Sequence, residues 1–191
     1  MMTPQKKRCA IVGTAESWKD TPWDDPSLEI WSLNDAYSLN GFQRADRWFE
    51  LHPTDKFYFR PKQQRAVYAE LVPPGHYVRP EGHMEWLREQ ARQIPVYLQN
   101  DPPKGWPPNA KRFPIEDAKA RFGDYWASGP SYMVALAIME GFEEIRVYGI
   151  HLATDHEYRD QRAQFEHILG IAKGLGITVY MAEKSPVMRH G

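Results

Sequence analysis

The stretch "WASGPSYMVALAIMEGFEEIRVYGIH", Trp126 to His151, joins a turn, a helix signal and a strand signal. A Ser-Gly-Pro-Ser turn at Ser128 to Ser131 stands before small and apolar residues, which predict a helix over 131–140 that ends at Gly141. The β-branched residues of "EEIRVYGIH" then predict a strand. A helix that leads directly into a strand is typical of an α/β protein.

The same alternation continues on both sides of this stretch. Further strands are predicted in "CAIVG" (9–13), "EIWSLND" (29–35), "ADRWFELH" (45–52), "PVYLQN" (95–100) and "ITVYMA" (177–182), and further helices over 63–71, 82–93 and 157–176. Strands that alternate with helices pair in parallel through right-handed crossovers. We therefore expect a Rossmann-like α/β fold, in which helices flank a mostly parallel sheet.

The 191 residues are enough for a single α/β domain over 1–191 with one long insertion. The segment 55–125 holds most of the 16 prolines, and Pro-Pro and Pro-Gly turns interrupt its two helical patterns. Such proline density indicates long ordered loops. A peripheral elaboration and a lid over the carboxyl rim of the sheet both fit this pattern.

Charge and cysteine content limit the class of protein. With 24 Lys+Arg and 25 Asp+Glu, the net charge of -1 gives no basic field for nucleic acid. Cys9 is the only cysteine, so it has no internal disulfide partner. The apolar run in "MMTPQKKRCAIVG" is too short for a signal peptide, and no window approaches the ~18 apolar residues of a membrane helix. We expect a soluble, cytoplasmic protein.

Polar and small residues follow the predicted strands. In an open parallel sheet, ligands bind beyond the carboxyl ends of the strands, so these residues are expected to line one rim. They are Gly13, Thr14, Ala15, Asn34, Asp35, His52 and His151. The turn of Ser128, Gly129 and Ser131 would add a helix N-terminus, which attracts anions; helix capping by either serine is the alternative.

Several familiar motifs are absent. "VGTAES" lacks the glycines of a dinucleotide fingerprint and the ending of a P-loop, and no G-x-S-x-G elbow is present. One cysteine and scattered histidines predict no zinc site. Asp155, His156 and Glu157 in "TDHEY" are interpreted as a solvated loop, and the chain has no D-x-D pair.

The block "ASGPSYMVALAIMEGFEEIRVYGIHL" resembles "SG-x-YM-x-x-x-AI-x-x-GY-x-EI-x-x-x-GID" of bacterial lipooligosaccharide sialyltransferases and of the related motility accessory factor and hydroxymethylpterin diphosphokinase families. "IVGTAESW" is similar to their first-strand loop, "G-x-GPSL", and "EIWSLNDAY" to the strand that ends on a nucleotide-contacting asparagine. The resemblance covers about half of the chain and leaves 55–125 unmatched. This chain departs from the pattern at Glu16, at the additional Pro130 and at His151, where relatives have aspartate.

The resemblance implies roles for the rim residues. Gly13, Thr14 and Ala15 would face the nucleotide phosphates or ribose, Asn34 the nucleoside, and Ser128 and Gly129 the phosphate or sugar of the donor. It implies a glycosyltransferase with a CMP- or UDP-type donor and no other cofactor, and the absence of a D-x-D pair favours a metal-independent transfer. His151 and His156 are the predicted bases, because imidazole titrates near neutral pH.

Two alternatives stay open at this point. A diphosphokinase-like phosphotransferase would need magnesium, for which Asp35, Asp155 and Glu157 are the candidate ligands. A non-catalytic protein would keep only the nucleotide pocket. The acceptor is not specified; a glycan is expected first and a modified nucleic acid second, with oligomers possible and no membrane partner expected.

Overall fold

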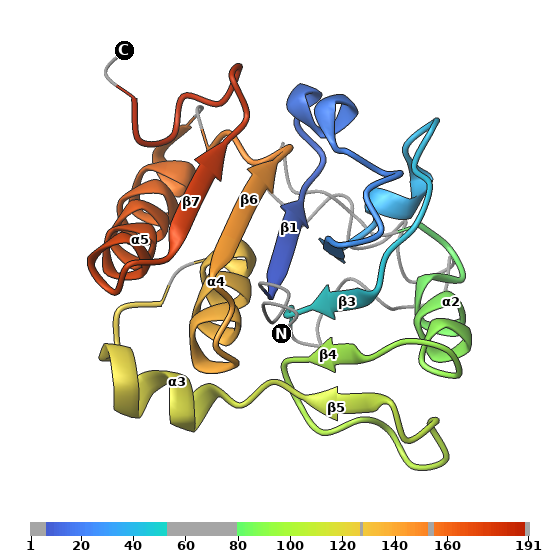
Figure 1. The fold of residues 1–191 in the computed structure, drawn as a ribbon. Coiled ribbons are helices and arrows are strands. Elements are labelled where there is room, and N and C mark those ends of the chain that lie inside the picture. The colour runs from blue at the N-terminus through green and yellow to red at the C-terminus, as the bar shows by residue number, and fades with distance from the viewer. Residues whose placement is uncertain (1–6, 53–79, 127, 153–154, 190–191) are drawn as a thin grey trace, which may run out of the picture.

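The computed structural model describes residues 7–52, 80–126, 128–152 and 155–189, without the side chains of 155–159. Seven strands form one sheet in the order β5-β4-β3-β2-β1-β6-β7, and every neighbouring pair is parallel (Figure 1). The strands are β1 (Arg8–Val12), β2 (Glu29–Leu33), β3 (Arg47–Glu50), β4 (Val96–Leu98), β5 (Ala110–Arg112), β6 (Glu144–Tyr148) and β7 (Thr178–Met181). The expected Rossmann-like α/β fold is confirmed.

Helices cover both faces of this sheet. They are the 3-10 helices η1 (Glu16–Asp20) and η2 (Ala36–Ser38), and the α-helices α2 (His83–Gln90), α3 (Ile115–Phe122), α4 (Gly129–Met139) and α5 (Asp155–Gly174). The chain runs from β1 through β5 in one direction and then places β6 on the other side of β1. The order of the strands therefore reverses between β1 and β6, which is where doubly wound sheets bind ligands. No helix in the described part of the chain is long and apolar enough to cross a membrane.

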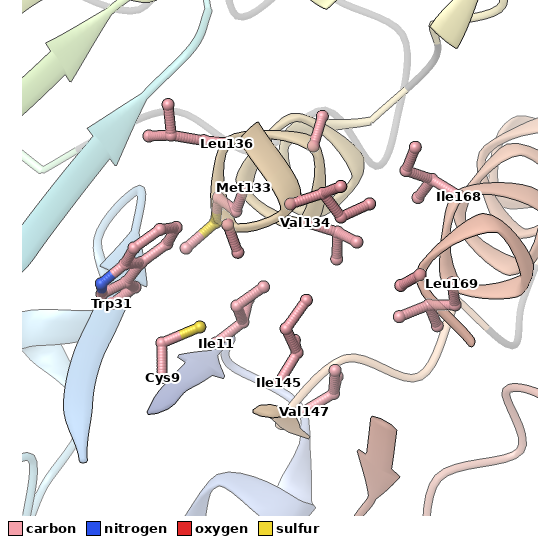
Figure 2. Close-up of a cluster of buried hydrophobic side chains, with 14 of the residues drawn as sticks. Cys9, Ile11, Trp31, Met133, Val134, Leu136, Ile145, Val147, Ile168 and Leu169 are labelled. Atoms are coloured by element: carbon pink, nitrogen blue, oxygen red, sulfur yellow. The ribbon is translucent and has the colours of Figure 1, made fainter. Parts of the chain in front are cut away.

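The larger core lies between the sheet and the helices α4 and α5. Figure 2 shows side chains of α4 and α5 converging on β1 and β6, with Met133 and Val134 above Ile11 and Ile145. Eight of the 11 residues of α4 are buried, so this helix is enclosed on nearly all sides. The small residues after the Ser-Gly-Pro-Ser turn suit that position because they let neighbouring elements approach closely.

The opposite face carries two smaller cores, in which tryptophan side chains pack on small and aliphatic residues. Trp18 of η1 and Trp23 pack over β1 and β2, while Trp86 of α2 packs over Trp48 of β3. Tyr37 of η2 stacks on Trp86 with ring centroids 3.9 Å apart. These aromatic contacts hold the short loop helices against the sheet, where few regular elements are available to cover it.

The predicted strands and the predicted helices at 82–93, 131–140 and 157–176 are confirmed within a few residues. β5 and α3, which both fall in the segment 55–125, were not predicted from the sequence. The described part of that segment extends the sheet, because β4 pairs with β3 and β5 pairs with β4. The predicted helix at 63–71 lies outside the described residues, so a lid over the rim stays a prediction for the part before residue 80.

Candidate functional site

Two glycines meet where the strand order reverses. A Cβ atom on Gly13, after β1, would lie 2.4 Å from the carbonyl oxygen of Gly149, and one on Gly149, after β6, would lie 2.5 Å from the carbonyl oxygen of Gly13. Gly149 also has a φ of 64°, in the left-handed region that favours glycine. Ala15 N donates to Gly149 O at 2.9 Å. Gly13, which the resemblance places against the nucleotide phosphates or ribose, lets the loops after β1 and β6 touch in this structure.

The first turn of η1 closes over this junction. Gly149 N donates to Ser17 Oγ at 2.9 Å, and Ser17 Oγ lies 3.0 Å from His151 Nε2. Ser17 is buried and His151 is half-buried. The predicted base His151 therefore stands at the rim, but its Nε2 atom is engaged by the serine. His156, the other predicted base, lies in the first turn of α5, and its side chain lies outside the described atoms.

The loop after β1 carries an acidic side chain where the resembling families have proline. The carboxylate of Glu16 forms an exposed ion pair with Lys184 Nζ at 3.0 Å. The hydrogen bond and the charge of Lys184 lower the pKa of Glu16. A cation thus accompanies this carboxylate at the rim, beside the exposed Thr14 and the half-buried Ala15.

Asn34 follows β2 in the left-handed conformation, with a φ of 57°. Its main chain forms the turn, because Asn34 N donates to Phe49 O at 3.0 Å and Asn34 O accepts from Trp48 Nε1 at 3.0 Å. The side-chain amide takes no part in those two bonds. The next residue, Asp35, is buried and begins η2 without a side-chain cap. The turn at Asn34 is therefore built by the backbone, and the amide is left for another partner.

The Ser-Gly-Pro-Ser turn lies at the same rim. A Cβ atom on Gly129 would lie 3.3 Å from Leu33 Cδ1, at the end of β2. Ser128 Oγ and Ser131 Oγ are 2.6 Å apart, both side chains are buried, and neither hydroxyl caps a backbone N–H of α4. Helix capping by either serine, the alternative to an anion site, is therefore not the arrangement in this structure. The N-terminus of α4 combines the Gly129 N–H group, two hydroxyls and the helix dipole.

A buried carboxylate that was not predicted from the sequence lies at the rim. Glu50, the last residue of β3, is fully buried, and we name its group with Tyr37, His52 and His83 the Glu50 cluster. His52 Nδ1 lies 2.6 Å from Glu50 Oε1, and His83 Nε2 lies 2.9 Å from Glu50 Oε2. Tyr37 Oη lies 3.0 Å from His83 Nδ1. Only His52, at a strand end, carried a signal in the sequence.

Two hollows lie at the other edge of the sheet, where the strands begin. One of about 500 Å³ is lined by Arg8, Glu29 and Arg44, and one of about 480 Å³ by Glu29, Arg47 and Glu140. Their charges are already paired: Arg47 Nε lies 2.9 Å from Glu29 and Arg47 Nη1 lies 2.7 Å from Glu140. We interpret this edge as structural. The chemically varied groups are at the carboxyl rim.

The structure describes no group of three or more His, Cys, Asp or Glu side chains arranged to hold a metal ion. The side chains of Asp155 and Glu157, two of the three magnesium ligands considered above, fall outside the described atoms. Asp35 has an interaction partner. The magnesium alternative is therefore not tested by these residues.

Comparison with known proteins identifies structures of similar fold but no protein family to which the chain belongs. No family model matches the chain, and no curated protein matches it in sequence. Among solved structures, the chain is similar to the apo α-2,3-sialyltransferase from Campylobacter jejuni, with a TM-score of 0.57 and 12% identity over 97% of this chain and 79% of that one. The chain has a sialyltransferase-like fold.

Two further structures of the same kind agree. The sialyltransferase CstII from Campylobacter jejuni in complex with the substrate analogue CMP-3FNeuAc has a TM-score of 0.54 and 14% identity over 92% of this chain and 79% of that one. CstII in complex with a trisaccharide acceptor and CMP has a TM-score of 0.54 and 15% identity over 92% of this chain and 81% of that one. The resemblance to sialyltransferases predicted from the sequence is confirmed for the fold; its diphosphokinase part finds no support in these structures.

Proposed function

We propose that this protein is a glycosyltransferase that uses a nucleotide-activated sugar, with a CMP-type donor as the first candidate. The proposal rests on the groups that lie together at the carboxyl rim of the sheet. The Asn34 amide, which the turn does not use, and the N-terminus of α4 both lie at the end of β2, next to the reversal of strand order. The fold supports it, since two of the three similar sialyltransferase structures contain CMP or the substrate analogue CMP-3FNeuAc.

In this proposal, Asn34 binds the base or ribose, because an amide both donates and accepts. Ser128, Gly129 and Ser131 bind the phosphate through hydroxyl groups and a backbone N–H at a helix N-terminus. Gly13, Thr14, Ala15 and Asp35 complete the surface around the nucleotide. The acceptor is proposed to be a glycan, as in the similar structure that holds a trisaccharide acceptor.

The reaction is a displacement at the anomeric carbon. An acceptor hydroxyl oxygen forms the new bond to that carbon, the bond from the carbon to the phosphate oxygen breaks, and its electron pair leaves with the nucleotide. Donors around the phosphate stabilise this developing charge, and an imidazole at the rim takes the acceptor proton. His151 and His156 are the bases proposed from the sequence.

Thermal denaturation with CMP, UDP, GDP and ATP, each with and without magnesium, tests the proposal. A ligand that binds only the native state raises the free energy of unfolding, by about 2.7 kcal/mol at a ligand concentration a hundredfold above Kd. The melting temperature rises as a result. We expect CMP to stabilise the protein equally with and without magnesium. A response to ATP that requires magnesium would instead favour the phosphotransferase, and no response to any nucleotide would contradict the proposal.

A further inference from the structure

The Glu50 cluster belongs to the same rim as the proposed nucleotide site. Phe49, which precedes Glu50 in β3, accepts the backbone hydrogen bond of Asn34, which follows β2. Neighbouring strands are about 4.8 Å apart, so Glu50 stands one strand spacing from Asn34. The cluster therefore lies where an acceptor could meet a donor held by the Asn34 turn and α4.

A fully buried carboxylate is costly unless hydrogen bonds compensate its charge. Each oxygen of Glu50 meets an imidazole nitrogen, at 2.6 Å for His52 and 2.9 Å for His83. When Glu50 is ionised, its oxygens only accept hydrogen bonds, and the protons then belong on His52 Nδ1 and His83 Nε2. In that tautomer of His52, Nε2 is the ring nitrogen that can accept a proton.

The second histidine explains why the carboxylate stays in place. The His83 side chain is 1% exposed, and its Nδ1 atom is within hydrogen-bond distance of the Tyr37 hydroxyl. Tyr37 is in turn stacked on Trp86. His83 and Tyr37 thus anchor one oxygen of Glu50 in the core, and the other oxygen holds the ring of His52 in one orientation.

We propose that His52 is the general base of the transfer and that Glu50 is the positioning residue that selects its tautomer. This inference rests on the proposed function. It follows from the pairing of a buried carboxylate with an imidazole that is 38% exposed at the rim. A base that is oriented by a carboxylate and reachable from solvent is the arrangement by which enzymes activate hydroxyl groups.

His52 fits this role better than the other described rim histidine. Nε2 of His151 lies 3.0 Å from the hydroxyl of Ser17, which also accepts the Gly149 N–H, so this ring helps to join two loops. His83 is enclosed in the core and has no access to an acceptor. His52 alone among these three combines a carboxylate partner with substantial exposure.

The proton balance is simple. As the acceptor oxygen bonds to the anomeric carbon, its proton passes to His52 Nε2 and the electron pair of the breaking bond leaves on the nucleotide phosphate. His52 then carries one positive charge beside the negative carboxylate of Glu50, which stabilises the imidazolium. The proton is released to solvent after the products leave, and the neutral Nδ1–H tautomer returns.

Histidine ring NMR on the full chain tests the geometry without a known acceptor. In ¹⁵N-labelled protein, long-range ¹H–¹⁵N spectra assign the tautomer of His52, and CMP is the probe. We expect the Nδ1–H tautomer in the wild type, ring signals that shift on saturation with CMP, and loss of the single tautomer in Glu50→Gln. An Nε2–H tautomer in the wild type overturns the proposal.

Kinetics supply the second readout. CMP release from CMP-sialic acid is compared for the wild type, His52→Gln, Glu50→Gln and His167→Gln, the last being an exposed histidine on α5. We expect kcat to fall about 100-fold or more in His52→Gln, with KM and CMP binding little changed, because general bases contribute on that scale. Exogenous imidazole should restore part of the rate in His52→Ala, and His167→Gln should behave as the wild type.

The outcomes separate this inference from the proposed function. If CMP does not stabilise the wild type, the proposed function fails first. If CMP binds but leaves the His52 ring signals unshifted, or if His52→Gln turns over as the wild type does, the nucleotide site stands and His52 is not the base. Should Glu50→Gln unfold, the tautomer of the wild type and the imidazole rescue of His52→Ala still decide the question.

Discussion

At the scale of single residues, the asparagine at position 34 has both a structural and a functional explanation, and substitutions can distinguish them. Its φ of 57° is a conformation that asparagine tolerates better than most residues, so the turn alone could explain its presence. Replacement by alanine would strain the backbone and remove the amide together. Replacement by glycine keeps the conformation accessible and removes only the amide.

We therefore predict that Asn34→Gly folds with a melting temperature near that of the wild type. We expect it to bind CMP more weakly, by about 1–3 kcal/mol, because a buried polar group of the ligand loses its hydrogen-bond partner. Isothermal titration with CMP measures the affinity, and thermal denaturation without ligand checks the fold. Asn34→Asp is the companion variant, since it keeps the left-handed turn and the size of the side chain. Wild-type affinity in Asn34→Gly would leave the turn as the reason for this asparagine.

The residues found from the sequence are those that directly follow strands. Asn34 and Ser128 were identified because a strand end and a helix start have local signals, and the shared rim then follows from parallel pairing. Glu50 was not identified, since its partner His83 is 33 positions away and Tyr37, which contacts His83, is 13 positions away. Only the register of the sheet and the packing of α2 bring these side chains together, and neither has a signature in the local sequence.

At the scale of elements, the N-terminus of α4 is the part on which the proposed nucleotide binding depends most directly. Val at position 129 would place branched carbons beside Leu33, where a built Cβ already lies at 3.3 Å, and would narrow the space in front of the helix N-terminus. We predict that Gly129→Val loses CMP binding with only a modest fall in melting temperature, because the buried face of α4 is unchanged. Titration with CMP and thermal denaturation measure the two effects.

The matched control is Gly170→Val in α5, where a built Cβ meets nothing within 4 Å. Valine has a higher helix propensity than glycine, so this variant should be at least as stable as the wild type and should bind CMP normally. If Gly129→Val also binds CMP normally, the turn serves only to begin α4.

The elements missed from the sequence lack an apolar pattern of their own. β5 has three residues, of which Lys111 and Arg112 are exposed, so the period that identifies a strand is absent. α3 begins after Pro114 and has only Ala118 fully buried. α4, by contrast, was found because its burial on nearly all sides requires a continuous run of small and apolar residues.

At the scale of the whole molecule, a network of ion pairs and the proposed nucleotide site lie at opposite edges of the sheet. At the amino edge, Arg47 of β3 bonds Glu29 of β2 and Glu140 after α4, and its guanidinium lies over the Trp31 ring at 4.5 Å from the ring centroid. This network ties the C-terminal end of the buried helix α4 to two strands. No residue of the proposed nucleotide site takes part in it, so the two edges are expected to respond independently to substitution.

Protonation of Glu140 provides the test. Burial raises the pKa of this carboxyl, but the hydrogen bond and charge of Arg47 outweigh burial and hold the pKa below its usual value of 4.5. A carboxyl with a lowered pKa in the folded state contributes stability above the unfolded pKa, and that contribution is lost as the pH falls through the folded pKa. Glu140→Gln removes the charge at every pH.

We predict that Glu140→Gln lowers the free energy of unfolding at neutral pH by roughly 1 kcal/mol. This is the contribution of a hydrogen bond to a charged group, reduced because the side chain is partly exposed. The difference between the two proteins should shrink as the pH falls below the folded pKa. Urea unfolding across that pH range measures it. Glu89→Gln, in the exposed pair with Arg92, is the control and should show little effect at any pH. CMP binding should be unchanged in both variants; a loss of binding in Glu140→Gln would mean that the amino edge and the rim are coupled through α4.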